Sequence, residues 1–167
     1  MSSTLTFSPV RQSIAGVAIT DLVERFGTPC YVYDQATIAE RVAELSAFDT
    51  VRYAQKALSN IAILDRLRKL GVVVDAVSAG EIGRALKAGF EPGSHPAGIV
   101  YTADIFDRPA LDLVVELNIP VNVGSPDMID QLGERAPGRN IALRINPGFG
   151  HGHSQKTNTG GPQSKHG

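Results

Sequence analysis

Val51-Arg52-Tyr53-Ala54-Gln55-Lys56-Ala57-Leu58-Ser59-Asn60 (residues 51–60) is the stretch that decides the fold. Its first part, Val51 to Gln55, predicts a strand able to enter a buried sheet. Ser59 or Asn60 suits the N-cap of a helix over Ile61–Leu70, where apolar residues recur at helical spacing. A strand that leads directly into a helix is the repeating unit of α/β folds.

The alternation of strand and helix continues from this stretch to about residue 145. The predicted strands are Val51–Gln55, Val72–Val74, Gly98–Tyr101, Pro120–Val123 and Ile141–Ile145. The predicted helices are Ile61–Leu70, Ser78–Gly89, Arg108–Leu117 and Ser125–Arg135. Five strands separated by four helices predict an α/β fold with a parallel sheet and right-handed crossovers. Spacing alone leaves an open doubly wound sheet and part of a (β/α)8 barrel as alternatives.

Shorter elements are predicted before residue 51. Ile19–Phe26 is predicted to form a helix that stops at Gly27. Cys30–Tyr33 is predicted to be a strand with Cys30 in a buried position. Asp34 suits the N-cap of a further helix that runs to about Ala47.

Size and composition narrow the class of protein. The chain has 167 residues, which is long enough for one domain with a hydrophobic core. Its net charge is −1. No basic stretch is long enough to bind along a phosphate backbone, which argues against nucleic acid as a partner. No run approaches the roughly 18 apolar residues of a membrane helix, and the N-terminus lacks the pattern of a secretory signal. A single cysteine makes a cytoplasmic location the default expectation.

Lys56 is the candidate for chemistry. The C-terminal end of a strand in a βα unit is where α/β folds place their active sites. A lysine there can condense with an aldehyde, which is how pyridoxal phosphate is held. The alternative is a solvated lysine that only caps the strand. The common glycine-rich nucleotide fingerprints are absent from the sequence.

The alternation of strands and helices stops after Asn146-Pro147-Gly148. Residues 149–167 are rich in glycine and histidine and nearly devoid of apolar side chains, which is typical of a tail or of a lid over a site. His151 and His153 have no nearby cysteine or carboxylate, and we predict no metal site there. A chain that ends on a long polar loop just after a core strand predicts truncation.

The segment around Lys56 resembles the pyridoxal-phosphate attachment signature of alanine-racemase-fold decarboxylases. The matching residues are Tyr53-Ala54-x-Lys56-Ala57-Leu58, then Ile63-Leu64, Leu67 and Gly71. Further segments resemble the diaminopimelate decarboxylases in the same order along the chain: residues 28–34 (TPCYVYD), 75–81 (DAVSAGE) and 143–148 (LRINPG). Residues 159–161 and 164–167 resemble a closing run of that family, with His166 where phenylalanine is usual. The resemblance covers roughly residues 15 to 167.

The resemblance implies a fold for the chain and a division of the chain into two segments. It implies an incomplete (β/α)8, TIM-like barrel with about five parallel strands. Residues 1–34 would be an N-terminal segment that pairs with a missing C-terminal β domain. Residues 35–167 would be the first half of a pyridoxal-phosphate-binding barrel. Because five strands cannot close an eight-stranded barrel, the last strand would present an open edge.

The resemblance also implies a reaction and a cofactor. The reaction is decarboxylation of meso-2,6-diaminopimelate to L-lysine and CO2, with pyridoxal 5′-phosphate attached to Lys56. Asp75, Glu81 and Arg144 would then lie at the cofactor site. Their alternative interpretations are a strand-end carboxylate, a capping-box glutamate and a surface ion-pair partner, respectively.

Several consequences stay open at the level of sequence. The resemblance implies a homodimer for a full-length member of the family and a small amino acid as substrate. We expect little or no decarboxylase activity from these residues alone. The alternative functions are a decarboxylase for another basic amino acid, such as ornithine, lysine or arginine, a non-catalytic pyridoxal-phosphate carrier, and a fragment that binds nothing.

Overall fold

The computed structural model describes residues 10–150, 159–162, 164 and 166. The chain divides into two compact units, Met1–Ser46 and Ala47–Gly167.

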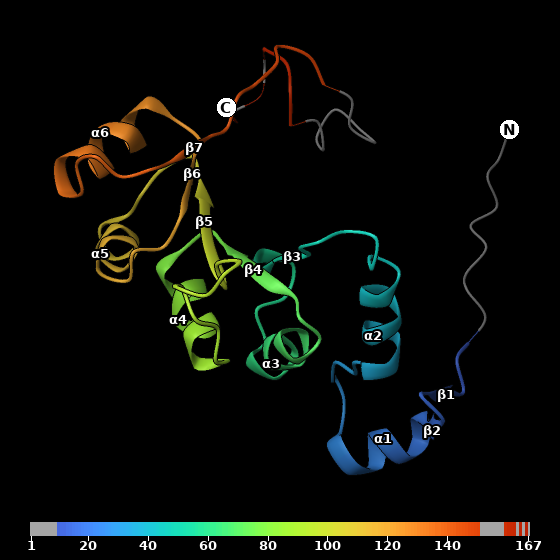
Figure 1. Ribbon diagram of the computed structural model, residues 1–167. Helices are drawn as coiled ribbons and strands as arrows, with labels where there is room; N and C mark the ends of the chain where they lie inside the picture. The colour runs from blue at the N-terminus through green and yellow to red at the C-terminus, as the bar shows by residue number, and fades with distance from the viewer. Residues whose placement is uncertain (1–9, 151–158, 163, 165, 167) are drawn as a thin grey trace, which may run out of the picture. The chain divides into compact units, whose positions relative to one another are not determined.

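The second unit is built on a five-stranded parallel sheet (Figure 1). Its strands are β3 (Arg52–Ala54), β4 (Val73–Ala76), β5 (Ile99–Ala103), β6 (Val121–Val123) and β7 (Ala142–Leu143). They lie in sequence order, each paired in parallel with the next. The predicted parallel sheet of five strands is therefore confirmed, and its sequential order is that of a (β/α) barrel rather than of a doubly wound sheet.

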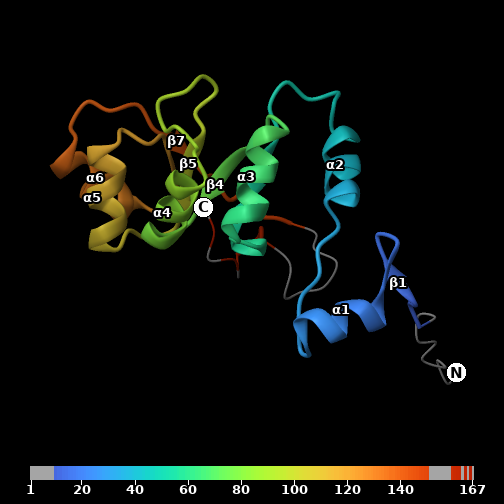
Figure 2. The ribbon, with the colours of Figure 1, turned by 90° about the horizontal axis from the view of Figure 1, so that it is seen from below.

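Four helices connect these strands and lie on one face of the sheet (Figures 1 and 2). They are α3 (Ile61–Lys69), α4 (Ala79–Lys87), α5 (Arg108–Glu116) and α6 (Pro126–Arg135). Each helix packs against the next one along the chain. This is the arrangement that right-handed crossovers between neighbouring parallel strands produce.

The helices begin where polar side chains satisfy their first backbone N–H groups. Asn60 Oδ1 accepts hydrogen bonds from the N–H of Ala62 at 2.9 Å and of Ile63 at 3.4 Å. Ser78 and Ser125 cap α4 and α6 in the same manner, through one N–H each. These three caps confirm the predicted helix starts, and each is typically worth about 1 kcal/mol.

The two faces of the sheet have different chemistry because side chains alternate along a strand. Val74, Ala76, Ile99 and Tyr101 are at most 1 % exposed and belong to the hydrophobic core. The intervening positions of three neighbouring strands carry half-buried polar side chains: Asp75, Thr102 and Asn122. The core therefore fixes one face of the sheet and leaves a polar row on the other.

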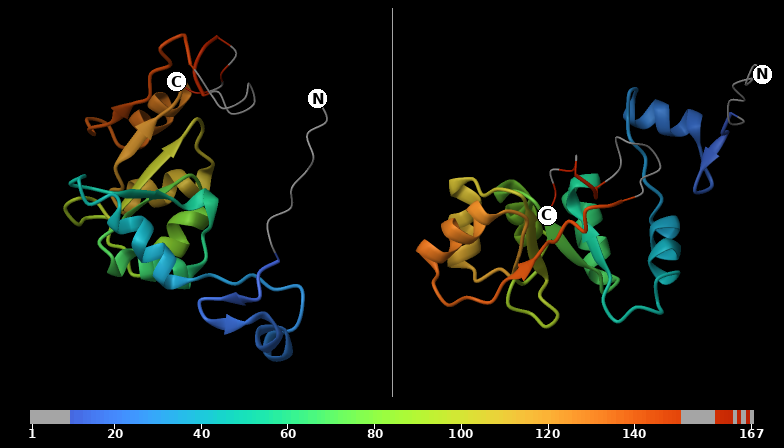
Figure 3. Two further views of the ribbon diagram at one scale, coloured as in Figure 1. Left: turned by 90° about the vertical axis from the view of Figure 1, so that its right-hand side faces the viewer. Right: turned by 90° about the horizontal axis from the view of Figure 1, so that it is seen from above.

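The first unit contains a small hairpin and two helices (Figure 3). Its elements are β1 (Ser13–Ile14), β2 (Val17–Ala18), α1 (Ile19–Phe26) and α2 (Gln35–Ala43). Ala15 and Gly16 form the hairpin turn with φ angles of 51° and 80°, the positive pair that a two-residue turn of type I′ requires. Neither helix of this unit has a buried residue.

Two predictions for the first unit are wrong. Residues 30–33 form no strand, and Cys30 is exposed rather than buried. A strand needs a neighbour to pair its backbone groups, and the hairpin strands β1 and β2 pair only with each other among the described residues. Helix α2 is N-capped by Asp34 as predicted, but it ends at Ala43 instead of about Ala47.

Candidate functional site

A cavity of about 320 Å³ lies at the C-terminal ends of the strands in the second unit. Its charged and polar lining comes from five segments that are far apart in the sequence: Lys56, Asp75, Thr102, Asp104, Arg144 and His166. Val77, Ala103 and Ile105 supply the apolar part of the lining. Side chains from several strand ends therefore meet at one place, as they do at the active sites of (β/α) barrels.

Lys56 lies in a single 3-10 turn, η1 (Gln55–Ala57), directly after β3. Its side chain is exposed, whereas its neighbour Gln55 is fully buried. The Tyr53 hydroxyl donates a hydrogen bond to the Leu58 carbonyl at 3.1 Å, which ties the end of the strand to the segment beyond the turn. The exposed Lys56 therefore lines the cavity from a turn whose two flanks are joined by this hydrogen bond.

Asp75 projects from β4 on the polar face of the sheet. Its Oδ1 accepts a hydrogen bond from the Thr102 hydroxyl of β5 at 2.5 Å. Burial raises the pKa of the Asp75 carboxyl above its ordinary value of 3.8. The Thr102 hydrogen bond and the positive charges of Arg52, Lys56 and Arg144 lower that pKa and so oppose the rise.

Arg52 lies in β3, whose Ala54 pairs with Asp75. Its Nη1 donates to the carbonyls of Val74 at 3.1 Å and Ala97 at 3.0 Å. Burial lowers the pKa of this guanidinium, and the charge of Asp75 works in the opposite direction. Arg52 is therefore a half-buried cation that is held mainly by backbone carbonyls.

Asp104 joins two further groups of the cavity. Its Oδ2 lies 2.8 Å from His166 Nδ1, and its Oδ1 lies 3.8 Å from Arg144 Nη1. Gly124, buried at the end of β6, leaves the space that this carboxylate occupies, because a Cβ at this glycine would overlap Asp104 Oδ1 and the Ala103 carbonyl oxygen. Gly124, directly after β6, thus makes room for Asp104, directly after the neighbouring strand β5.

His166 lines the cavity, and the chain before it is anchored at Gly161. Asn146 Nδ2 donates to the Gly161 carbonyl at 2.9 Å, and Asn146 Oδ1 accepts from the Gly161 N–H at 2.9 Å. The same Oδ1 accepts from the Gly148 N–H at 3.0 Å. One asparagine amide therefore links the chain after β7 to Gly161.

Glu81 occupies a different position from the other predicted site residues. Its Oε2 accepts a hydrogen bond from the Val77 N–H at 2.9 Å, and its own N–H donates to Ser78 Oγ at 3.3 Å. It is 8 % exposed and is not among the residues that line the cavity. The Ser78 contact is that of a capping box, but the Glu81 carboxylate bonds the N–H of Val77, one residue before the N-cap Ser78. The role of Glu81 at a cofactor stays a prediction.

Three of the four predicted site residues, Lys56, Asp75 and Arg144, line one cavity. Sequence reasoning missed Thr102 and Asp104. Thr102 follows the predicted strand Gly98–Tyr101 directly and Asp104 comes two residues later. Polar residues at a strand end are the signal that could have identified them. His166 was noted for its unusual identity but was not placed at the site.

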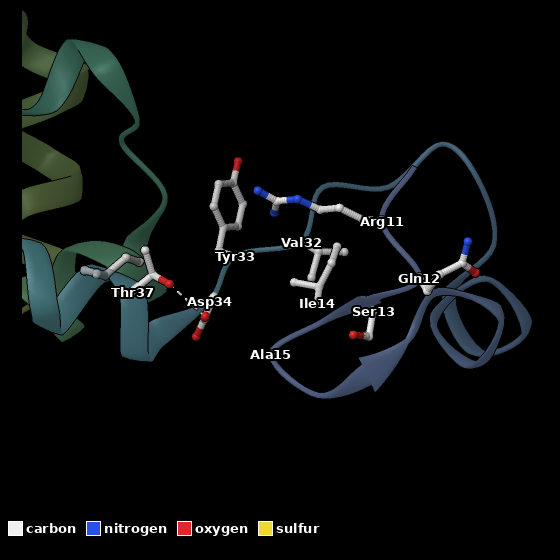
Figure 4. Close-up of a pocket in the computed structure, with 10 residues that line it drawn as sticks. Arg11, Gln12, Ser13, Ile14, Ala15, Val32, Tyr33, Asp34 and Thr37 are labelled. Atoms are coloured by element: carbon white, nitrogen blue, oxygen red, sulfur yellow. Dashed lines mark hydrogen bonds between the residues drawn. The ribbon is translucent and has the colours of Figure 1, made fainter. Parts of the chain in front are cut away.

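A second cavity, of about 620 Å³, lies within the first unit (Figure 4). Residues of the hairpin and of the start of α2 line it, including Arg11, Tyr33, Asp34 and Thr37. Figure 4 shows the Thr37 hydroxyl hydrogen-bonded to Asp34, a distance of 2.8 Å. No lysine or histidine is among the residues that line this cavity, and it therefore lacks the amine on which the site prediction depends.

Within residues 10–150 and the described positions after 158, no cluster of three or more His, Cys, Asp or Glu side chains could hold a metal ion. His151 and His153 lie outside the described residues. In the same part of the chain, no helix is long and apolar enough to cross a membrane.

Comparison with known sequences identifies relatives of the whole arrangement. Residues 35–167 match the family described as pyridoxal-dependent decarboxylase, pyridoxal binding domain. The diaminopimelate decarboxylase of Escherichia coli K12 is 60 % identical over 146 residues, which cover 87 % of this chain and 35 % of that protein. The diaminopimelate decarboxylase of Streptomyces coelicolor is 55 % identical over 155 residues, 93 % of this chain and 35 % of that protein. The chain spans about 35 % of the length of these relatives.

Solved structures give the same result. A crystal structure of diaminopimelate decarboxylase superposes with a TM-score of 0.82 at 60 % identity, covering 87 % of this chain and 35 % of the other. The Helicobacter pylori diaminopimelate decarboxylase, crystallised with L-lysine, superposes with a TM-score of 0.78 at 31 % identity. That match covers 89 % of this chain and 39 % of the other.

Proposed function

Because the chain belongs to the pyridoxal-dependent decarboxylases through their pyridoxal binding domain, we propose that Lys56 covalently attaches pyridoxal phosphate. We propose further that the parent activity is decarboxylation of meso-2,6-diaminopimelate to L-lysine and CO2. The observation that carries the first proposal is the position of Lys56, which presents an exposed primary amine to a cavity that also contains Asp75 and Arg144.

The lining of the cavity fits such a cofactor. Pyridoxal phosphate has an aldehyde that takes an amine, a basic ring and an anionic phosphate. Lys56 supplies the amine, Asp75 supplies a carboxylate on the same polar face, and Arg144 supplies a fixed positive charge. When bound there, pyridoxal phosphate would supply an electron sink for the decarboxylation.

The residues of the chain have the remaining tasks of binding and orientation. Lys56 fixes where the cofactor is attached, because its turn is anchored on both sides. Arg144 is half-buried and its backbone N–H donates to the Val123 carbonyl at 2.8 Å, so the root of its side chain is tied to β6. Asp75 and Asp104 balance the positive charges of Lys56 and Arg144 within the cavity.

The substrate assignment rests on the relatives. Curated relatives at 60 % and 55 % identity are diaminopimelate decarboxylases. A lysine decarboxylase structure is similar at only 21 % identity, which supports a shared fold and not a shared substrate. Diaminopimelate is therefore the substrate that we favour over another basic amino acid. The homodimer and the cytoplasmic location remain predictions from the family resemblance and from the single cysteine.

Reductive trapping tests the attachment. The 167-residue chain is incubated with pyridoxal phosphate, treated with borohydride and mapped by peptide mass spectrometry. We expect the cofactor mass on the peptide that contains Lys56, and its loss in Lys56→Arg, which keeps the charge but lacks a primary amine. Lys69→Arg is the matched control, since Lys69 is exposed and paired with Asp65 on α3. Labelling that is unchanged in Lys56→Arg would contradict the proposal.

A separate assay measures CO2 release from meso-2,6-diaminopimelate. Little or no release from residues 1–167 alone stays our prediction, since the chain spans about 35 % of the length of its relatives. Attachment at Lys56 without CO2 release would support cofactor binding and leave catalysis to a longer chain. Release at the rate of a normal decarboxylase would show that the prediction of inactivity is wrong.

A further inference from the structure

Three neighbouring strands carry a chain of hydrogen bonds that ends on Asp75. Asn122 Nδ2 of β6 donates to Thr102 Oγ1 of β5 at 2.7 Å. The Thr102 hydroxyl donates in turn to Asp75 Oδ1 of β4 at 2.5 Å. The backbone register allows this chain because Thr102 and Asn122 are direct partners across β5 and β6.

The chain of hydrogen bonds has a direction. A threonine hydroxyl has one hydrogen to donate and two lone pairs that can accept. Asn122 occupies an acceptor position of the Thr102 hydroxyl, and the hydroxyl hydrogen then goes to the Asp75 carboxylate. A hydrogen bond to an ionised acceptor is about twice as strong as a neutral one, so this direction favours the ionised form of Asp75.

The direction of these hydrogen bonds matters because burial has the opposite effect on the pKa of Asp75. Desolvation is the largest influence on Asp75 and raises its pKa, whereas the Thr102 hydrogen bond is the largest influence that lowers it. The charges of Arg52 in β3, Lys56 in η1 and Arg144 after β7 also act on Asp75. Asp104 after β5 and His166 line the same cavity. The state of Asp75 is therefore set by a balance in which Thr102 has the leading stabilising part.

We propose that Thr102 and Asn122 are positioning residues that keep the Asp75 carboxylate ionised and oriented in the Lys56 cavity. Neither residue needs to touch a ligand for this role; both act through Asp75. The consequence for pyridoxal phosphate rests on the function proposed above, whereas the effect on Asp75 belongs to the free protein. The two can therefore fail separately.

A titration of the free chain tests the effect on Asp75. The carboxyl carbon of Asp75 is followed by NMR in ¹³C-aspartate-labelled protein, with Asp75→Asn to assign the signal. We expect Thr102→Val to move the midpoint upward by about half a pH unit or more. Thr102→Ser retains the hydroxyl and is expected to restore the midpoint. An unchanged midpoint in Thr102→Val would overturn the proposal.

Asn122→Ala keeps the test decisive if Thr102→Val does not fold. This variant leaves the Thr102 hydroxyl in place but removes the group that directs its hydrogen. We expect a smaller upward shift of the same midpoint, and a downward or absent shift counts against the role of Asn122. Thr37→Val is the matched control, because it removes a threonine–aspartate hydrogen bond of the first unit and should leave Asp75 unchanged.

The pH dependence of borohydride-trapped pyridoxal phosphate gives a second readout. We expect the profile of Thr102→Val to shift relative to wild type and Thr102→Ser to follow wild type. If wild type traps no cofactor while the Asp75 midpoint still moves in Thr102→Val, the proposed function fails and the positioning role stands. If the cofactor is trapped normally and neither the midpoint nor the profile moves, the positioning role fails alone.

Discussion

Two threonine–aspartate hydrogen bonds in this chain use the same chemistry in opposite settings. In the first unit, Thr37 Oγ1 donates to Asp34 Oδ2 at 2.8 Å, three residues apart on one helix start. In the second unit, Thr102 Oγ1 donates to Asp75 Oδ1 at 2.5 Å, 27 residues apart on neighbouring strands. Each threonine lowers the pKa of its aspartate.

The net result for the two carboxylates is nevertheless opposite. The Thr37 and Ala36 hydrogen bonds lower the pKa of Asp34, at the start of α2, below 3.8. Burial outweighs the equivalent hydrogen bond at Asp75 and raises its pKa above 3.8. The environment, and not the hydrogen bond, decides the direction. The same threonine–aspartate pair can therefore tune a site when it lies half-buried on the polar face of the sheet.

The largest expected effect comes from substitutions in the hydrophobic core of the second unit, which supports the sheet that carries Asp75. Ile82 of α4 is 0 % exposed and packs in the core of the second unit, whereas Phe26 of α1 is 63 % exposed. We expect Ile82→Ala to cost about 2–5 kcal/mol of unfolding free energy. Phe26→Ala should cost less than about 1 kcal/mol, since it removes only exposed area and a surface contact with Arg25.

Urea denaturation of the 167-residue chain measures both costs. Ile82→Val is the conservative control, expected to cost about 0.5–1.5 kcal/mol. Equal costs for Ile82→Ala and Phe26→Ala would show that the second unit does not provide the packed frame on which the contrast depends.

The pH dependence of stability should have opposite signs for the two aspartates. Asp75 has a raised pKa in the folded state, so its contribution is fully present below 3.8 and is lost as pH rises through the folded value. Asp34 has a lowered pKa, so its contribution is present above 3.8 and is lost as pH falls through the folded value.

Asparagine variants isolate each contribution, because asparagine does not titrate and still accepts a hydrogen bond. The stability of wild type minus that of Asp75→Asn should fall with rising pH in a window that begins at 3.8 and extends upward. The corresponding difference for Asp34→Asn should rise with pH in a window that begins below 3.8 and ends there. Slopes of the same sign would show that the two environments do not differ as described.

The same contrast explains what the sequence could predict. The caps at Asp34 and Ser78 were predicted, and Asn60 was one of two candidates with Ser59. Each cap bonds backbone groups two or three residues away, which spacing alone reveals. Hydrophobic period predicted the five strands and the four helices between them. The strand over residues 30–33 was wrong because a strand depends on a partner that local sequence does not specify.

Strand ends and family motifs predicted three residues of the site. Lys56, Asp75 and Arg144 each stand in or just after a strand, and parallel strands bring such positions to one edge. The hydrogen bond from Thr102 to Asp75 depends on the register between β4 and β5, and one residue of slip would turn Thr102 to the other face. The contact of His166 with Asp104 spans 62 residues and no periodicity encodes it.

The smallest expected effect is that of Thr37→Val on helix α2. The variant removes one hydrogen bond to Asp34 but keeps the cap itself, since the Ala36 N–H still donates to Asp34 Oδ1 at 2.9 Å. We expect a slight loss of helix protection over Gln35–Ala43 by amide hydrogen exchange and a small upward shift of the Asp34 midpoint. Thr37→Ser should behave as wild type. Because water can replace a lost partner at this exposed position, the shift should be smaller than that of Asp75 in Thr102→Val. A shift as large as the one at Asp75 would mean that the hydrogen bond, rather than burial, governs both carboxylates.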